Sequence, residues 1–543
     1  FVRERSGRAA RVDVSLQAAV AAGLEHVPSR FFADGTITRR SGALHWGRFF
    51  RTGPARDGWG CYTTLGDWTT LVEWMKADGM AGDLDDPVYA DPSVRQARAE
   101  HVFDVIDAWA QRYDASDLAA RAQQVRLAFA PVRSPEALFT DPQLAARGFF
   151  VPASHDAAGR EVSFPGPPCR LGALPARFAC EPRADEDGDA VLRDWVAAPS
   201  GPVAASADVS SITDRPLAGV RVLDFTWMGA GPIATRVLAD LGADVVRIEH
   251  PRTPETGDRR GGIMGNLGRG KRSVVLDLTT DEGRFAARRF AAGCDVVIDN
   301  FSARVMDAWG LGPESLQALK PDLVVVRMTG FGLTGPDRDH VSYGPTLQAR
   351  AGYTALMTAP DGAPMGFGYS YADVASGQLA ALAVLAALWR RQRTGAGAVV
   401  DFSQLEAVAA LLGPILLERA LDGARSLPPG NASQEGPAAP HGVYPCAGDD
   451  RWIALAIFTD DDWRRFVRAI GAPAWTRDPR FASLAGRLAH AGELDRLVAS
   501  WTRAQNADAA MVALQQAGVT AGRVADAVDL CERDPQLTAR GHF

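Results

Sequence analysis

The clearest hydrophobic pattern of the chain lies in residues 217–278, where short apolar runs alternate with one helix-spaced segment. Residues 222–226 form the first apolar run, residues 233–241 carry apolar side chains at helical spacing, and residues 244–249 form the second run. Gly229 and Gly231 lie between the first run and the helical segment. This order predicts one βαβ unit with a glycine turn at the start of its helix. Such a turn favours a phosphorylated ligand, because backbone N–H groups there approach an anion unobstructed.

A further strand and a long helix extend the same pattern. The basic stretch from Gly268 to Ser273 introduces a strand predicted at residues 274–278, and Tyr371-Ala-Asp373 opens an Ala/Leu-rich helix over residues 374–391. The apolar part of this helix is shorter than the roughly twenty residues that cross a bilayer, and it contains polar side chains. We therefore predict a buried helix, without a membrane contact.

Sequence repeats indicate how the chain is divided. Residues 141–150, Asp-Pro-Gln-Leu-Ala-Ala-Arg-Gly-Phe-Phe, recur with two changes at residues 534–543, and the Val-Asp-Val-Ser of residues 12–15 recurs as Val-Asp-Phe-Ser at residues 400–403. A set of two aromatic residues and an arginine also repeats: Trp68, Tyr89 and Arg95 parallel Trp463, Phe481 and Arg487. Residues 12–150 are therefore predicted to be a diverged copy of residues 400–543.

The repeat predicts three parts. Residues 1–178 form a partial copy, residues 179–215 form a linker that is poor in large apolar side chains, and residues 216–543 form a fuller copy. Within the linker, residues 191–195 are expected to form a short helix. Because the first copy starts in the middle of the pattern, at Phe1 instead of Met, we interpret the chain as a piece of a longer fused protein, with a natural permutation as the alternative.

Charge and composition narrow the function classes. The formal net charge of −7 argues against nucleic acid as the main partner. A local basic cluster lies beside the glycine turn, and we expect Lys271 and Arg272 in it to contact an anionic phosphate; its other members are Arg259, Arg260 and Arg269. The six cysteines are scattered without a CxxC pair, which favours a reduced cytoplasmic location. The histidines show no metal-ligand spacing, so no metal is expected.

Asp373 is the candidate catalytic residue. Aspartate is a good helix N-cap, so one interpretation is purely structural. The other is chemical: the positive end of a helix dipole keeps a carboxylate ionised, and an ionised carboxylate can act as a nucleophile. The two roles are compatible.

Residues 217–543 resemble the class III (CaiB/BaiF-type) CoA-transferases. The segment Tyr371-Ala-Asp-Val-Ala-Ser-Gly377 is similar to the catalytic segment of that family. The other matching motifs follow the family's order: Asn300-Phe301, Thr329-Gly-Phe-Gly332, Tyr343, Val400-Asp-Phe-Ser403, Gly430-Asn431 and Asp478-Pro-Arg-Phe481. The resemblance implies an α/β protein with a Rossmann-like large domain, about residues 216–410, and a smaller α+β domain, about residues 440–520.

The resemblance also implies the chemistry and the ligand. Asp373 would accept the acyl group of an acyl-CoA as an anhydride and then CoA as a thioester, so coenzyme A and acyl-CoA are substrates and no cofactor is held permanently. The positions that match the family's CoA contacts are Met228, Gly229, Ala230, Leu276, Asn300 and Phe301. Two departures put phosphate contacts in doubt: His250 and Ala308 stand where many relatives have basic residues.

Three alternatives remain open from the sequence. Gly229, Gly231 and Ala234, with Glu249 twenty residues after Gly229, fit the loose dinucleotide fingerprint of an NAD(P)-dependent dehydrogenase. An acyl-CoA racemase of the same superfamily needs a second acid/base group, and relatives that racemise have histidine where this chain has Tyr343. A non-catalytic CoA-binding protein is the third alternative.

The resemblance implies interlocked homodimers, and the repeat suggests an intramolecular substitute for one. We expect residues 1–178 to pack on residues 216–543 as a pseudo-partner, in an intramolecular pseudo-dimer or a homodimer. The partners expected are an acyl-CoA and a carboxylic acid, with neither nucleic acid nor a membrane.

Overall fold

The computed structural model describes residues 2–3, 11–24, 26–155, 160–172, 188–197, 215–251, 262–423, 430–431, 433 and 436–543. The chain divides into two compact units. The first unit comprises residues 1–36, 41–357 and 364–425, and the second comprises residues 37–40, 358–363 and 426–543.

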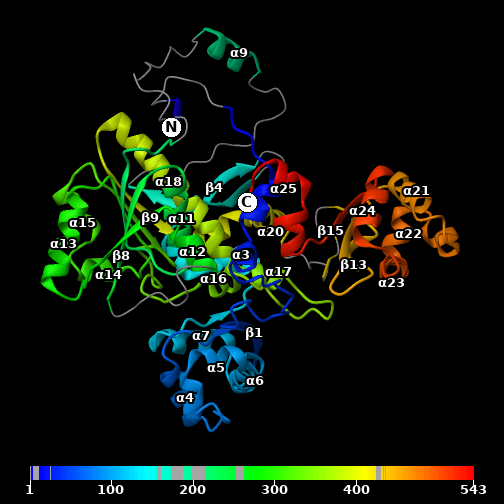
Figure 1. Ribbon diagram of the computed structural model, residues 1–543, viewed down its shortest axis with the longest axis horizontal. Helices are drawn as coiled ribbons and strands as arrows, with labels where there is room; N and C mark the ends of the chain where they lie inside the picture. The colour runs from blue at the N-terminus through cyan, green and yellow to red at the C-terminus, as the bar shows by residue number, and fades with distance from the viewer. Residues whose placement is uncertain are drawn as a thin grey trace. The chain divides into compact units, whose positions relative to one another are not determined.

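A seven-stranded sheet forms the centre of the first unit (Figure 1). Its strands run in the order β6-β12-β11-β10-β7-β8-β9. All pairs are parallel except the edge pair β6–β12, which is antiparallel. The strands are β6 (Cys169–Leu171), β7 (Arg221–Asp224), β8 (Asp244–Glu249), β9 (Lys271–Val275), β10 (Val296–Asp299), β11 (Val324–Thr329) and β12 (Ala398–Ser403). The protein therefore has a mixed α/β fold with a mainly parallel sheet.

Helices cover both faces of this sheet, as the apolar strands require. On one face α11 (Ala230–Asp240) and the 24-residue α18 (Tyr371–Thr394) share a core with Val222 and Val324. The next residue of each strand, Leu223 or Val325, points to the opposite face, because side chains alternate along a strand. The helices that follow the strands elsewhere are α12 (Gly262–Gly268), α13 (Asp281–Ala292), α14 (Arg304–Ala308), α15 (Pro313–Leu319), α16 (Gly344–Arg350), α17 (Tyr353–Leu356), α19 (Gln404–Leu411) and α20 (Gly413–Asp422).

The predicted βαβ unit is present, but one strand begins earlier than expected. Strand β9 starts at Lys271, whereas the apolar run predicted residues 274–278. The reason is backbone pairing with β8, which runs from Val245 opposite Lys271 to Glu249 opposite Val275. The register thus brings two basic residues into the strand.

Helix α18 is the single described helix that is long and apolar enough to cross a membrane by length and composition. Its most apolar window is 56% buried within the protein, which agrees with the predicted core helix. Small side chains on α18, including Ala380 and Ala383, let it lie close to the sheet.

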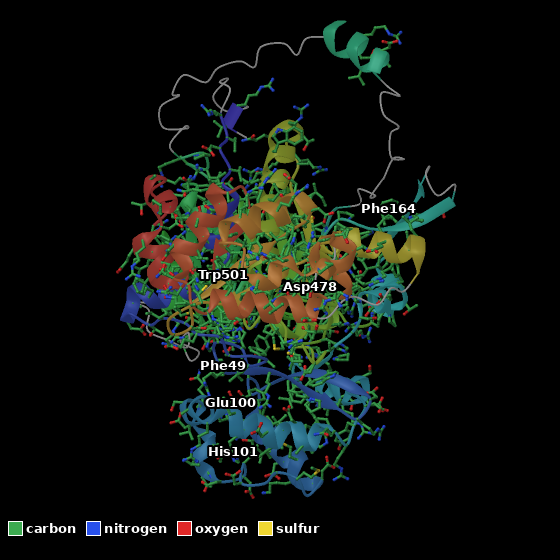
Figure 2. All side chains as sticks on the ribbon, turned by 90° about the vertical axis from the view of Figure 1, so that its right-hand side faces the viewer. Phe49, Glu100, His101, Phe164, Asp478 and Trp501 are labelled. Carbon is green, nitrogen blue, oxygen red and sulfur yellow. The ribbon has the colours of Figure 1, made fainter. Side chains whose placement is uncertain are left out.

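Residues 41–131 form a small α/β layer within the first unit (Figure 2). Three antiparallel strands, β1 (Phe50–Ala55), β2 (Gly58–Thr63) and β3 (Ala130–Pro131), carry a helical core that includes Trp109. Phe49 precedes β1, and His101 lies on α6. The helices are α4 (Trp68–Ala77), α5 (Pro92–Ala97), α6 (Ala99–Ala110) and α7 (Ala115–Gln124), preceded in the chain by α2 (Leu16–Ala22) and α3 (Val27–Asp34).

Residues 141–171 join this layer to the large sheet. Helix α8 (Pro142–Ala146) is followed by the hairpin β4 (Phe150–His155) and β5 (Arg160–Pro165), and β6 then pairs with β12. The N-terminal residues therefore contribute one strand to the sheet of the C-terminal residues. Part of the predicted linker is also described: α9 (Gly188–Ala197) contains the expected short helix.

The second unit has a comparable construction. It contains the antiparallel strands β13 (His441–Pro445), β14 (Trp452–Ala456) and β15 (Thr520–Arg523). Its main helices are α21 (Asp460–Ala469), α22 (Leu484–Ala489), α23 (Ala491–Thr502), α24 (Ala507–Gln516) and α25 (Pro535–Ala539). The Arg487 guanidinium lies 5.2 Å from the ring centre of Trp463, and Arg95 lies 4.7 Å from that of Trp68. The residue sets that repeat in the sequence thus make the same cation–π contact.

Candidate active site

Asp373 lies in the first turn of α18 and is pressed between two glycines. A methyl group on Gly229 would lie 2.8 Å from Oδ2 of Asp373, and one on Gly344 would lie 2.7 Å from the same atom. Carbon and oxygen do not approach so closely without displacement, so only glycine fits at either position. The loop after β7 and the start of α16 therefore define where this carboxylate can be.

The loop after β7 is held in an unusual conformation. Met228 has a positive φ of 65°, and Gly229 is the residue that precedes α11. Asn300 braces the turn: its amide nitrogen donates to the carbonyl of Trp227 at 2.7 Å, and its oxygen accepts from the Trp227 N–H at 2.8 Å. Ala230 is buried as the first residue of α11. The predicted ligand contacts of these four residues stay predictions; of the four, Gly229 lies directly against Asp373.

Lys271 and Arg272 have protein partners. The Lys271 ammonium donates to Thr235 Oγ1 at 2.7 Å and to the Pro232 carbonyl at 3.0 Å, and it forms a buried ion pair with Asp224 at 3.3 Å. It therefore fastens α11 to the sheet. Arg272 forms an exposed ion pair with Asp244. Arg259 and Arg260 lie outside the described residues, and the expected phosphate contacts of this basic cluster stay predictions.

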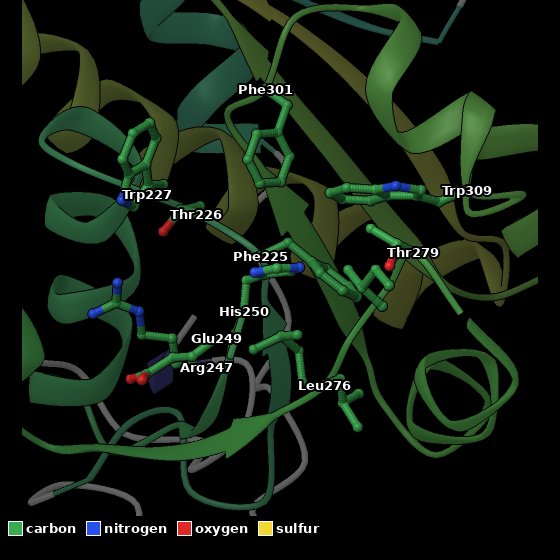
Figure 3. A pocket seen from close by; sticks show the side chains of 12 residues that line it. Phe225, Thr226, Trp227, Arg247, Glu249, His250, Leu276, Thr279, Phe301 and Trp309 are labelled. Atoms are coloured by element: carbon green, nitrogen blue, oxygen red, sulfur yellow. The ribbon is translucent and has the colours of Figure 1, made fainter. Parts of the chain in front are cut away.

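A pocket of about 310 Å³ opens at the carboxyl ends of β7, β8, β9 and β10 (Figure 3). This edge of a parallel sheet is where α/β proteins usually bind ligands, and the volume lies within the usual range of small-molecule sites. Phe301 and Trp309 meet edge to face with ring centres 5.4 Å apart. The lining residues are Phe225, Thr226, Trp227, Arg247, Ile248, Glu249, His250, Leu276, Leu278, Thr279, Phe301 and Trp309.

Two predicted ligand residues, Leu276 and Phe301, line this pocket, whereas Met228, Gly229 and Ala230 lie on the loop that leads from it to Asp373. Trp309 and Thr279 were not predicted. Trp309 follows a short helix and has no motif around it, so no sequence signal pointed to it. The apolar aromatic walls with a few polar side chains, among them Thr226 and Thr279, suit a flat heterocycle.

Residues of the N-terminal layer reach the Asp373 end of this loop. The rings of Phe50 and Tyr343 meet edge to face at 5.5 Å, and His45 Nε2 lies 3.2 Å from the hydroxyl oxygen of Ser370, the residue before α18. Burial raises the pKa of Tyr343 and lowers that of His45 to about 3. Both side chains are thus neutral near pH 7. The described residues contain no group of three or more potential metal ligands.

The fold and the site together define an α/β protein with a heterocycle-sized pocket next to a constrained carboxylate. The model of CoA-transferase family III matches residues 1–188 and 217–543, so the chain belongs to CoA-transferase family III, as its motifs predicted. Among solved structures, a CAIB/BAIF family protein from Brucella suis is 31% identical; the match covers 60% of this chain and 88% of that one, with a TM-score of 0.56.

Curated relatives are also CoA-transferases by name. The succinyl-CoA–D-citramalate CoA-transferase of Chloroflexus aurantiacus is 38% identical over 336 residues, which cover 60% of this chain and 82% of the relative. The probable CoA-transferase Rv1866 of Mycobacterium tuberculosis is 30% identical over 521 residues, which cover 90% of this chain and 62% of the relative. The chain thus spans less than two thirds of that longer relative.

Proposed function

We propose that this protein transfers CoA from an acyl-CoA donor to a carboxylic acid acceptor. The observation that carries the proposal is the carboxylate of Asp373, which is confined by Gly229 and Gly344 at one end of a loop whose other end lines the pocket. A nucleophile held in one position, next to a pocket for a heterocycle, is what the reaction of a CoA thioester needs.

In the proposed mechanism, a carboxylate oxygen of Asp373 attacks the thioester carbonyl carbon. The carbon–sulfur bond breaks, CoA leaves as a thiolate, and an acyl-aspartyl anhydride remains. The thiolate then attacks the aspartyl carbonyl, the donor acid leaves as a carboxylate, and Asp373 carries CoA as a thioester. An acceptor carboxylate repeats the two steps in reverse, which regenerates Asp373 and releases the new acyl-CoA.

The adenine of CoA would occupy the aromatic pocket between Phe301, Trp309 and Leu276. The pantetheine arm would then follow the loop of residues 226–230 toward Asp373. The names of several relatives pair succinate or succinyl-CoA with citramalate, glutarate or mesaconate. We therefore propose succinyl-CoA as the first donor to test, with small dicarboxylic acids as acceptors.

The experiment is an exchange assay read by mass spectrometry. Protein is incubated with succinyl-CoA and a panel of acids, and new CoA esters are measured for the wild type, Asp373→Asn and Asp373→Ala. We expect transfer by the wild type, and loss of transfer with retained CoA binding in both variants, since the nucleophile is lost and the pocket is not. Hydroxylamine should trap modified Asp373 during turnover. Retention of most activity by Asp373→Ala would overturn the mechanism.

The same protein with other ligands distinguishes the three alternatives. A racemase exchanges the α-proton of a chiral acyl-CoA in deuterated water, which requires a second acid/base group. The neutral, partly buried Tyr343 is a poor base near pH 7, because its raised pKa keeps the phenol protonated. A dehydrogenase would bind NAD(H) or NADP(H), and a non-catalytic protein would bind CoA without any exchange.

We also propose that residues 1–178 are a diverged partial copy of the C-terminal part. This proposal is supported by the repeated sequence blocks, the shared order of three antiparallel strands, and the equivalent arginine–tryptophan contacts.

A further inference from the structure

A tight turn of the N-terminal layer reaches the start of α18. Residues 45–50 form this turn: the His45 N–H donates to the Phe50 carbonyl at 2.9 Å, and the Trp46 N–H donates to the carbonyl of Gly368 at 2.9 Å. The second bond anchors the turn on the segment that leads into α18. His45 is only 7% exposed, and its ring packs against those of Phe50 and Trp46.

The hydrogen bonds of His45 determine which ring nitrogen carries the proton. The Gly47 N–H donates to Nδ1 at 3.0 Å, so Nδ1 is an acceptor and the proton is on Nε2. Nε2 lies 3.2 Å from Oγ of Ser370 and is therefore the donor in that contact. Because burial keeps the ring neutral, this arrangement persists across the physiological pH range.

Ser370 precedes α18, yet its side chain makes no capping hydrogen bond to the helix. Serine at this position normally accepts from an N–H of the first turn. Here the N–H of Ala372 is satisfied by Gln348 Oε1 at 3.1 Å, and the N–H of Asp373 by the Ser370 carbonyl at 3.0 Å. The Ser370 hydroxyl contacts His45 Nε2, and the Ser370 carbonyl accepts a hydrogen bond from the Asp373 N–H.

Ser370 and Asp373 also share one packing surface. A methyl group on Gly344 would lie 2.8 Å from Cβ of Ser370 and 2.7 Å from Oδ2 of Asp373. The two side chains therefore press on the same point of α16. A displacement of Ser370 moves the carboxylate of Asp373, through both the backbone bond and this contact.

We propose that His45 is a positioning residue for CoA transfer: its Nε2–H bond to Ser370 holds the start of α18, and so Asp373, in the orientation needed for attack on the thioester. The N-terminal layer then completes the site of the C-terminal residues. This inference rests on the proposed role of Asp373 as nucleophile.

The test compares shape-matched variants in the full chain. His45→Phe keeps the aromatic ring and removes the hydrogen bond, His45→Gln keeps a donor near the Nε2 position, and Ser370→Ala removes the acceptor. We expect His45→Phe and Ser370→Ala to lower kcat by about 10- to 100-fold, as misplacement of a reacting group by about 1 Å can do, with the KM for succinyl-CoA changed less than about 2-fold. His45→Gln should retain more than about a third of kcat.

The double variant separates positioning from a general loss of structure. If His45 acts through Ser370, His45→Phe/Ser370→Ala loses no more activity than either single variant, because one interaction is removed in all three. His101→Phe, an exposed histidine on α6 of the same layer (Figure 2), is the control and should leave kcat unchanged. Thermal unfolding of every variant is followed in parallel.

Wild-type kcat in folded His45→Phe, or multiplicative losses in the double variant, would overturn the proposal. If His45→Phe does not fold, Ser370→Ala alone decides: unchanged kcat overturns the proposal. Failure of the proposed function gives a different result, since Asp373→Asn would then remain active or wild-type Asp373 would remain unlabelled during turnover.

Discussion

At the level of single residues, the position of Asp373 depends on two neighbouring glycines, which have no side chain. Gly229 and Gly344 are separated from it by 144 and 29 positions, yet the space beside each α-carbon is filled by its carboxylate. The sequence pointed to Asp373 through its place at a helix start and to Gly229 through a turn. It gave no signal that Gly344 contacts Asp373.

We predict that Gly344→Ala lowers transfer by about 100-fold, because the added methyl group displaces the carboxylate from its proposed attack position. The assay is the succinyl-CoA exchange reaction, with unfolding measured by circular dichroism. Gly492→Ala is the matched control: its methyl group would meet nothing within 4 Å, so activity should not change. Full activity of Gly344→Ala would show that the confinement of Asp373 is unimportant.

A second residue-level prediction concerns pH. Burial raises the pKa of Asp107 on α6 to about 6, although Arg51 opposes the shift. Because this pKa is higher in the folded state than in the unfolded chain, the protonated carboxyl stabilises the fold at low pH, and this contribution is lost as pH rises through about 6. The melting temperature of Asp107→Asn should therefore rise relative to that of wild type as the pH increases from 4 to 8. The control is Asp104→Asn, which alters an exposed carboxylate near the same arginine and should change the melting temperature less with pH. A difference in melting temperature between Asp107→Asn and wild type that does not depend on pH would contradict the prediction.

At the level of elements, a buried arginine joins α8 to the large sheet. Arg147, which follows α8, donates to both carboxylate oxygens of Glu406 on α19, at 2.5 and 3.0 Å, and to Asp401 on β12 at 2.8 Å. Gln143 on α8 donates to the carbonyls of Phe331 and Thr334 at 2.6 and 2.7 Å. In this segment, polar side chains of the repeated block 141–150 thus satisfy buried groups on other elements of the first unit.

We predict that Arg147→Met destabilises the protein by about 3–5 kcal/mol, since it leaves the Glu406 carboxylate buried without its partner. Arg147→Met/Glu406→Met should recover part of this loss, because both buried charges of the pair are then absent. Both effects are measured as changes in the free energy of unfolding by denaturant titration. If the double variant is as unstable as the sum of the two single variants, the pair is not the cause.

At the level of the whole chain, the N-terminal residues supply parts that the C-terminal residues use. They contribute β6 to the sheet, Arg147 to its buried ion cluster, and His45 to the start of α18. The expected packing of residues 1–178 against the C-terminal part is thus observed within the first unit. Whether this segment stands in for a second subunit stays a proposal.

Removal of residues 1–215, the N-terminal copy with the linker, tests that proposal. The fragment 216–543 should aggregate or form new oligomers, because the deletion uncovers the edge of β12 and the apolar surface beneath α8. Light scattering and size-exclusion chromatography measure this outcome. A soluble monomeric fragment with unchanged thermal stability would mean that the two parts are only tethered.

The sequence by itself determined the features that depend on local periodicity and backbone sterics. These are the βαβ unit, the glycine turn before α11, the buried helix α18 with Asp373 in its first turn, and the family. Leu276 and Phe301, predicted as ligand residues, line the pocket, and their contact with a ligand stays a prediction. Each of these follows from residues close together in the chain, or from motifs that keep their order.

Only the tertiary structure decided which distant residues share the site. The strand register places Lys271 next to α11, where its ammonium group contacts Asp224 and Thr235. Its charge therefore stabilises the packing of α11 on the sheet. Chain folding brought His45 to Ser370 across 325 positions. Periodicity cannot encode such contacts, because they arise when two surfaces with independent local patterns pack together.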